Sequence, residues 1–323
     1  MAAFLIRRLF WAVFLFFAAT IVTYLIFFVI PADPAKLAAG RNATAQDVKR
    51  VAAFLHLNVP IYQQYWIFLW NILRHGSLGY SYVSRQPVRF LVGQDAPVTA
   101  SLVFGGAVFW LSLSVPVGIL SALRPRSLMD RLSMTFVLIG ISAHPVWIGL
   151  ILSFVVGYKL HWTPIAGYCN FFPGSGAAQC SGPVQWAYHM ILPWITFMVL
   201  FAALYVRLIR ANVIETMSED YVRTARAKGA SDRRVMVQHV LRNSMLPVVT
   251  ILGMDIGLAL GGAVFTETIF SLPGLGHDVV AANAAGDLPL ITGIVVFATV
   301  AVILFNLVVD MTYAALDPRI RLG

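Results

Sequence analysis

Charge is scarce in this sequence. Of its 323 residues, only 11% are Asp, Glu, Lys or Arg, whereas 59% are hydrophobic. A water-soluble domain usually carries about 25% charged residues, so the composition excludes an ordinary soluble protein. Several uncharged runs each exceed the ~20 residues with which a helix crosses a bilayer. The sequence therefore predicts a membrane protein.

Signatures of catalysis are also missing. The sequence contains no Gly-rich phosphate loop that ends in Lys-Ser/Thr, and no HExxH zinc motif. The seven histidines are scattered along the chain. We therefore expect no catalytic residues, no metal-binding residues and no cofactor bound by this chain, so any energy source must be external.

The uncharged runs predict an all-α polytopic protein, because only helices that satisfy their own backbone suit such runs in lipid. Six transmembrane helices are predicted, at residues 9–32, 96–123, 132–158, about 188–206, 243–266 and 288–309. The first is longer than a signal-peptide core and is interpreted as a retained span. The chain then divides into residues 1–32, an extracytoplasmic helical region at 33–95, and a five-helix core at 96–323.

Lys and Arg are concentrated in alternate connections between the predicted spans, including residues 124–131 and 207–242. By the positive-inside rule, these connections face the cytoplasm, so both termini are predicted to be cytoplasmic. The net charge of +9 is assigned to contact with anionic membrane lipid, and no nucleic acid is expected as a partner.

The predicted extracytoplasmic region contains two helix candidates. Thr44 suits an N-cap, with Asp47 in the first turn of the following helix. Residues 60–73 are rich in Tyr, Trp and Phe, which favour a membrane interface. We interpret these helices as a packed cover over the outer mouth.

The chain has two cysteines, Cys169 and Cys180. Both fall in the predicted outer connection between the third and fourth spans, where an oxidising compartment would let them pair. We expect a disulfide, and the alternative is two unrelated free thiols.

A polar segment at residues 207–246 interrupts the apolar sequence and is predicted to form a cytosolic helical hairpin. Ser218 is expected to cap a short helix whose first turn carries Glu219 and Asp220. Gly229 is expected to end that helix in a left-handed conformation. A helix of about ten residues is marginal alone in water, so tertiary contacts or a partner must hold it.

Short motifs occur along the chain, namely LHLNVP at 55–60, GSLGYS at 76–81, DYVRTARAKG at 220–229, HVLRN at 239–243, ETIF at 267–270, PGLG at 273–276 and DPRIR at 317–321. With these motifs in this order, the sequence resembles a known family, the permeases of binding-protein-dependent ABC importers. The resemblance is to the B-type permease of the dipeptide/oligopeptide/nickel branch, and it runs nearly end to end. Against the general EAA pattern of the cytosolic loop, Arg223 and Thr224 replace Glu and Ala, and only Ala225 fits.

The resemblance implies a type I ABC importer permease in a bacterial plasma membrane. It implies a second homologous C-type permease, two ATPase subunits that use ATP and Mg²⁺, and an extracytoplasmic substrate-binding protein. The solute would be a di- or oligopeptide, with nickel, glutathione or another peptide-like solute as the alternative within the family. The ATPase-coupling residues implied are Glu219, Asp220, Tyr221, Val222, Arg223, Ala225, Arg226, Lys228 and Gly229.

Asp255 is an ionisable residue inside a predicted span, where the family would have an uncharged polar residue. Such a group is costly in lipid and should face the bundle interior or water. It either lines the translocation path or makes a structural bond to another helix. Two other classes of function are considered: an ion-coupled secondary transporter, which often has inverted repeats that we do not find here, and a membrane enzyme, for which the catalytic set is missing.

Overall fold

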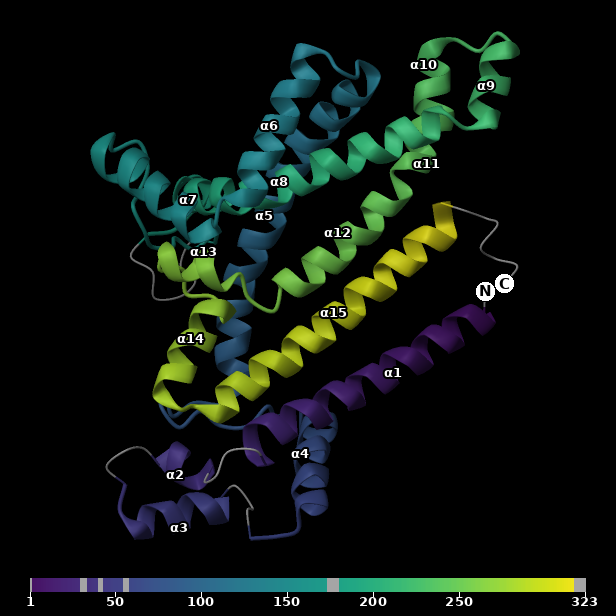
Figure 1. The fold of residues 1–323 in the computed structure, drawn as a ribbon. Helices are drawn as coiled ribbons and strands as arrows, with labels where there is room; N and C mark the ends of the chain where they lie inside the picture. The colour runs from purple at the N-terminus through teal and green to yellow at the C-terminus, as the bar shows by residue number, and fades with distance from the viewer. Residues whose placement is uncertain (1, 30–33, 40–42, 55–57, 173–179, 317–323) are drawn as a thin grey trace. The chain divides into compact units, whose positions relative to one another are not determined.

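The computed structural model describes residues 2–29, 34–39, 43–54, 58–172 and 180–316 (Figure 1). Within these residues the chain is helical, and no strand occurs beyond two isolated bridges, Tyr80 with Pro87 and Asn170 with Ser181. The all-α prediction is confirmed. The chain forms two compact units, which are described separately.

Unit 1 comprises Met1–Ala100, Gly257–Thr268 and Pro273–Gly323. Its helices are α1 (Ala2–Tyr24, continued by a π-helical turn at Leu25–Val29), α2 (Pro34–Ala39), α3 (Ala45–Phe54), α4 (Ile61–His75), the start of α5 (Val88–Leu123), most of α13 (Val264–Ile269), α14 (Leu275–Ala285) and α15 (Leu288–Leu316). Helix α1 runs alongside α15, and α14 packs against α15 (Figure 1).

The core of unit 1 is a buried aliphatic cluster from α5, α14 and α15. Its members are Val88, Val92, Leu275, Ala282, Leu290, Ile291 and Ile294. The predicted helices of the N-terminal region are confirmed. The Thr44 hydroxyl accepts from the Asp47 backbone N–H and donates to the Asp47 carboxylate, which caps α3. Helix α4 is held to α1, because the Tyr24 hydroxyl donates to Gln64 Oε1 over 2.8 Å.

Unit 2 comprises Ser101–Ile256 and Ile269–Leu272. It holds the rest of α5, then α6 (Leu128–Ser142), α7 (Pro145–Leu152, continued as a π-helix at Ser153–Lys159), α8 (Pro183–Met217), α9 (Asp220–Ala227), α10 (Asp232–Arg234), a π-helical segment at Val235–Leu241, α11 (Arg242–Ser244) and most of α12 (Leu246–Ala259). Helix α8 packs against both α6 and α7. An aromatic cluster joins α5 to α8, where Trp110 stacks on Phe201 with ring centroids 4.7 Å apart.

Among the residues that the structure describes, four helices are long and apolar enough to cross a membrane, namely α1, α5, α8 and α15, and the number rises to six if two bent helix pairs each count as one span. The first bent pair is α6 with α7. The single helix predicted at residues 132–158 is wrong, because the chain bends by 101° between them. His144 has an extended backbone and Pro145 follows it, as expected because proline disfavours the α conformation in the preceding residue.

Two other predicted spans have different limits. Helix α8 begins at Pro183 and continues to Met217, so the first part of the predicted polar loop at 207–246 extends a long helix. The span predicted at residues 243–266 ends its regular helix at Ala259. Gly262 then turns the chain with φ +127, a conformation that glycine adopts without strain.

Candidate functional site

The predicted hairpin at the end of α8 is present, but its first cap differs from the prediction. The Ser218 hydroxyl donates to the Glu215 carbonyl over 2.7 Å and closes α8. Glu219, with φ −68 and ψ 147, occupies the N-cap of α9 without a side-chain cap bond. The expectation that Ser218 caps α9 is therefore wrong, since its hydroxyl bonds backward rather than forward.

The predicted left-handed end of α9 is confirmed at Gly229, which has φ +79. The Gly229 N–H donates to the Arg226 carbonyl, and the Ala230 N–H donates to the Ala225 carbonyl. These two bonds form a Schellman motif, which satisfies carbonyls that would otherwise lack partners at the helix end. A side chain at position 229 would meet no atom within 4 Å, so only the backbone conformation requires glycine here.

A buried side chain and a polar bond help to attach helix α9 to the rest of unit 2. Val222 is fully buried, as are Val235 and Val240 of the π-helical segment against which α9 packs. The Tyr221 hydroxyl accepts from Asn243 Nδ2 over 2.8 Å. Val222, a predicted contact residue, therefore anchors α9 from within and presents no surface to a partner.

The other predicted coupling residues form the outer face of α9. Arg223, Arg226 and Lys228 are exposed, as is Tyr221. Arg223 lies 3.6 Å from Asp220, but the two side chains are 71% and 98% exposed, so this pair adds little stability. A pocket of about 320 Å³ adjoins this face and is lined by Asn212, Glu215, Thr216, Glu219, Tyr221, Asn243, Ser244 and Pro247. The hairpin thus presents cationic and acidic groups to solvent.

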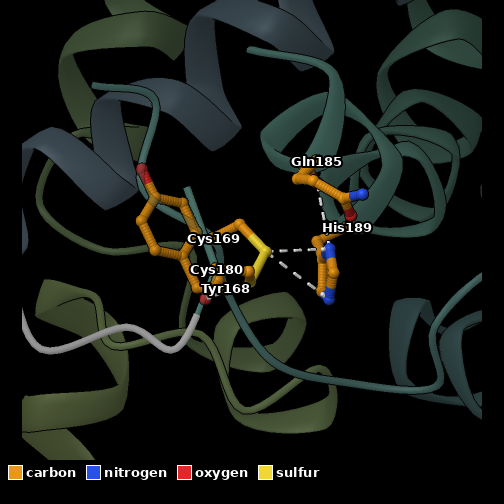
Figure 2. The surroundings of a disulfide bond; sticks show 5 residues. All are labelled: Tyr168, Cys169, Cys180, Gln185 and His189. Carbon is orange, nitrogen blue, oxygen red and sulfur yellow. Dashed lines mark hydrogen bonds between the residues drawn. A yellow bond between two sulfur atoms is a disulfide. The ribbon is translucent and has the colours of Figure 1, made fainter. Parts of the chain in front are cut away.

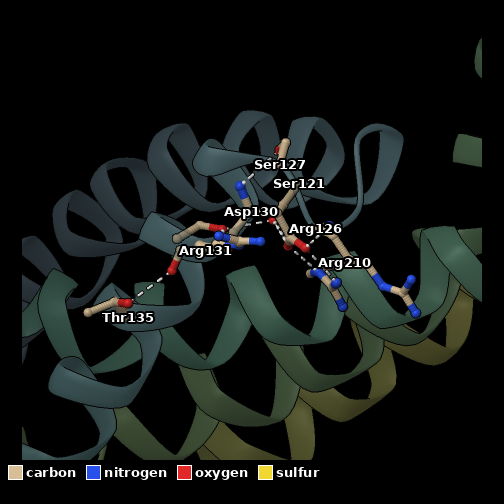
Figure 3. A network of polar contacts seen from close by, with 8 residues as sticks. Ser121, Arg126, Ser127, Asp130, Arg131, Thr135 and Arg210 are labelled. Carbon is tan, nitrogen blue, oxygen red and sulfur yellow. Dashed lines mark hydrogen bonds and ion pairs between the residues drawn. The ribbon is translucent and has the colours of Figure 1, made fainter.

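Helix α8, which leads into this hairpin, is fastened to α6 by a bidentate ion pair that sequence reasoning missed (Figure 3). Arg210 donates from Nε to Asp130 Oδ1 over 2.6 Å and from Nη2 to Oδ2 over 3.0 Å. Asp130 also accepts from the Ser121 hydroxyl and the Arg126 backbone N–H. The signal in the sequence was Ser127 three residues before Asp130, a helix-start pattern that the structure confirms.

Unit 1 contains a second buried carboxylate, Glu267, which lies in the ETIF motif. Its Oε2 accepts from the backbone N–H groups of Gly276 and His277 over 2.7 and 3.0 Å, and its Oε1 accepts from the Thr99 hydroxyl over 2.8 Å. Glu267 therefore binds the N-terminus of α14, where the helix dipole favours negative charge. A Cβ at Gly276 would lie 2.7 Å from the Val264 backbone, which explains the glycine in the PGLG motif.

A third carboxylate explains the GSLGYS motif at 76–81. Asp287 is buried just before α15 and accepts a short hydrogen bond from the Ser81 hydroxyl. The backbone N–H groups of Tyr82 and Val83 donate to the same carboxylate over 3.4 Å. The loop after the motif is thus fixed to the start of α15. A cavity of about 870 Å³ lies beside this loop in unit 1, lined in part by Tyr24, Gln64, Asn71 and Arg89.

Asp255, Cys169 and Cys180 all lie in unit 2. Asp255 is half-buried on α12, and its Oδ2 accepts from the Tyr205 hydroxyl of α8 over 2.7 Å. Cys169 and Cys180 form a disulfide in the structure (Figure 2). The DPRIR motif at 317–321 lies outside the described residues.

Comparison with known proteins agrees with these motifs. Residues 114–322 match the family described as binding-protein-dependent transport system inner membrane component, and residues 1–103 match its N-terminal membrane component family. The chain is 35% identical to the dipeptide transport system permease protein of Escherichia coli K12. It is 36% identical to the glutathione transport system permease protein of Escherichia coli O6:H1, and each alignment covers 99% of both chains.

The match at residues 114–322 covers the hairpin, ETIF and PGLG motifs, the match at 1–103 covers the GSLGYS motif, and the relatives cover nearly the whole chain, so the resemblance drawn from the sequence is confirmed. The apolar helices fit the same assignment. This chain belongs to the family of inner-membrane components of binding-protein-dependent transport systems and is a multi-pass ABC importer permease of the B type.

Proposed function

We propose that this permease forms half of the pathway of an ATP-driven importer for short peptides delivered by an extracytoplasmic binding protein. The full-length similarity to a dipeptide permease and a glutathione permease supports this solute class. Glutathione is itself peptide-like, so the two relatives point to related chemistry. Nickel is the alternative within the family, and neither of these two relatives is named for it.

The proposed assembly contains a homologous C-type permease, two ATPase subunits and the binding protein, with lipid around the permeases. ATP and Mg²⁺ are used by the ATPases, and both termini of this chain face the cytoplasm. One ATPase docks on α9 through Tyr221, Arg223, Arg226 and Lys228, supported by Glu219, Asp220 and Ala225. The observation that carries this assignment is the exposed helix α9, which is capped at its C-terminal end, anchored by Val222 and joined to α8 by a short link.

Force applied to α9 would reach the membrane helices along a short route. Only Ser218 and Glu219 separate α9 from α8, so a movement of α9 is passed to the end of α8. The Asp130–Arg210 ion pair then fastens α8 to α6. On this account, closure of the ATPases moves α9, α8 and α6 together and opens the translocation path. Hydrolysis of ATP then resets the path.

Replacement of Gly229 tests the coupling assignment. In Gly229→Val, the β-branched residue cannot readily adopt φ +79, so α9 should lose its C-terminal cap. We expect peptide uptake per ATP hydrolysed to fall at least about tenfold in proteoliposomes that contain the whole importer. Gly229→Asn is the matched control, because Asn tolerates the left-handed region, and it should retain most of the coupling. Equal coupling in Gly229→Val and wild type would exclude the cap as a coupling element.

Asp255 is the ionisable residue that we assign to the translocation path. Asp255 bonds to Tyr205, and it is half-buried rather than fully buried in the core. Asp255→Asn preserves shape and can still accept that bond while removing the charge. We expect uptake of peptides with a free amino terminus to fall relative to N-acetylated peptides. Unchanged preference at normal expression would make the Tyr205 bond the whole role of Asp255.

An ion-coupled transporter is distinguished by its independence of ATPase subunits. Liposomes that contain the permease pair alone should not accumulate peptide under a proton or sodium gradient. Accumulation without the ATPases would reject the proposed function.

A further inference from the structure

The cavity of about 870 Å³ beside the GSLGYS loop lies away from the proposed coupling hairpin, within unit 1. Its walls come from α1, α3, α4, the loop before α5, and the first turns of α5 and α15. This volume falls within the range of about 300–1,000 Å³ in which proteins hold small ligands. The cavity is therefore large enough for a ligand and is built by one unit.

The lining combines an apolar wall with a few polar groups that lack partners. Ile67 and Phe68 contribute to the apolar wall, whereas the side chains of Asn71, His75 and Arg89 supply hydrogen-bond donors. Among the described residues, none of these three side chains has a hydrogen-bond or ion-pair partner. All three are exposed, so their donors can reach a ligand in the cavity.

The charges around the cavity favour an anion. Arg89 is positively charged, and none of the described lining residues is acidic. Asp287, the acid just before α15, is buried, and its carboxylate accepts from the Ser81 hydroxyl and from backbone N–H groups. Arg89 also lies in the first turn of α5, where the helix dipole adds partial positive charge. A guanidinium binds phosphate and carboxylate groups through paired N–H donors.

The position of the cavity along α1 places it near the lipid headgroups. Tyr24 lines the cavity and, at a rise of 1.5 Å per residue, lies about 5 Å from the end of the apolar stretch Ile6–Phe27. Helix α4 is fastened there, because the Tyr24 hydroxyl donates to Gln64. The same helix exposes Trp66 and Trp70, a residue type that is enriched where membrane meets water.

We propose that this cavity binds one anionic phospholipid, with its phosphate on Arg89 and the upper part of an acyl chain along the apolar wall. Asn71 and His75 donate further hydrogen bonds to oxygens of the headgroup. A short peptide also carries a carboxylate, but the position at headgroup level favours the lipid. The bound lipid would connect α1, α4 and α5. This site does not depend on the proposed transport function, because it concerns one cavity of the permease alone.

Native mass spectrometry of the full-length permease, titrated with phosphatidylglycerol in detergent, tests the proposal. We expect one phosphatidylglycerol molecule to stay bound. Phosphatidylcholine should bind at least about tenfold more weakly, because its quaternary ammonium places a second cation near Arg89.

The substitutions address the individual donors. Arg89→Gln should raise the Kd for phosphatidylglycerol by at least about tenfold, the expected loss for a hydrogen bond to a charged group. Arg89→Lys keeps a charge that binds phosphate and should retain most of the affinity. Asn71→Ala should raise the Kd severalfold, and it keeps the test decisive if Arg89→Gln aggregates, because the exposed Asn71 side chain has no described partner.

Arg74→Gln is the matched control. Arg74 also lies on α4, but its guanidinium stacks on the Trp70 ring, 5.3 Å from the centroid, and Arg74 is not among the described lining residues. This variant should leave the Kd unchanged. An equal loss in Arg74→Gln and Arg89→Gln would mean general attraction to surface charge and would overturn the proposal.

Three further results would overturn it: a Kd that neither Arg89→Gln nor Asn71→Ala alters, equal affinity for phosphatidylcholine, or displacement of the lipid by a free anion. Millimolar inorganic phosphate and dialanine serve as the two competitors in the last measurement. Displacement by dialanine would assign the cavity to the solute, whereas displacement by phosphate would assign it to small anions.

Discussion

Two buried carboxylates, one in each unit, are satisfied by different chemistry. Asp130 in unit 2 has an exposed fraction of 7% and receives an Arg210 guanidinium, a serine hydroxyl and a backbone N–H. Glu267 in unit 1 is fully buried, and its donors are two backbone N–H groups of α14, a longer contact from the Ala263 N–H, and the Thr99 hydroxyl. Within the described residues, no ion pair involves Glu267.

The difference shows that a carboxylate in a low-charge membrane protein needs hydrogen-bond donors more than it needs an opposite charge. A helix N-terminus supplies donors that have no intrahelical partner, together with a favourable dipole. Glu267 therefore binds a structural element rigidly without a cation. Asp130 instead depends on a long side chain from another helix, so its partner can be removed by a single substitution.

Removal of the cation should have the largest effect. Arg210→Met leaves Asp130 charged and buried, which costs about 3–5 kcal/mol when a buried pair is broken on one side. We expect a loss of that size in the free energy of unfolding in mixed micelles, and disruption of the α6–α8 contact. The double variant Asp130→Asn/Arg210→Met should recover much of it, because the amide oxygen still accepts from the Arg126 backbone N–H while the amide NH₂ donates to the Ser121 hydroxyl oxygen. A double variant as unstable as the single one would contradict the charge argument.

Removal of one acceptor from Glu267 should cost less. In Glu267→Gln, an amide NH₂ replaces one carboxylate oxygen, so one of the donors around it loses its acceptor, at a cost of about 1–3 kcal/mol. Hydrogen exchange of the Gly276 and His277 amides should accelerate, while α3 exchanges as before. The control Glu215→Gln changes an exposed residue and should leave these amides protected. Protection that survives in Glu267→Gln would mean that one amide oxygen in the place of Oε2 holds both N–H groups and that the negative charge adds nothing.

The exposed carboxylate Asp47 should give the smallest effect. The Thr44 hydroxyl and backbone N–H donate to it, and these hydrogen bonds lower its pKa. Because the folded pKa lies below the unfolded value of about 3.9, the stabilisation is present above that value and is lost as pH falls through the folded pKa. Thr44→Val removes the hydroxyl, so the Asp47 pKa should rise towards its ordinary value in a carbon-13 NMR titration. An unchanged pKa would assign the shift to the remaining backbone bond.

The sequence predicted what depends on local rules. The uncharged runs predicted helices, Thr44 and Asp47 predicted the start of α3, and Gly229 predicted the end of α9. The bend between α6 and α7 could have been found by the same means, because Pro145 disfavours helix at His144. The Ser218 prediction failed because a serine hydroxyl can bond to the carbonyl three residues before it as readily as to a later N–H.

What could not be predicted requires knowledge of which distant segments meet. Arg210 and Asp130 are 80 residues apart, and Thr99 and Glu267 are 168 apart. No local pattern pairs them in a single sequence. Asp255 illustrates the same limit, because its helix partner Tyr205 lies 50 residues away in the sequence.

The Asp287 bond has a consequence for how the chain is made. The partner of Ser81 lies 206 residues downstream. At 5–20 residues per second, the ribosome needs roughly 10–40 s to synthesise that length of chain. During that interval the GSLGYS segment has been synthesised but its acceptor has not. Insertion of the last membrane helix would thus be the event that completes the amino-terminal part of the molecule, and truncation before α15 should leave the beginning of the protein, rather than its end, as the region that proteases attack first.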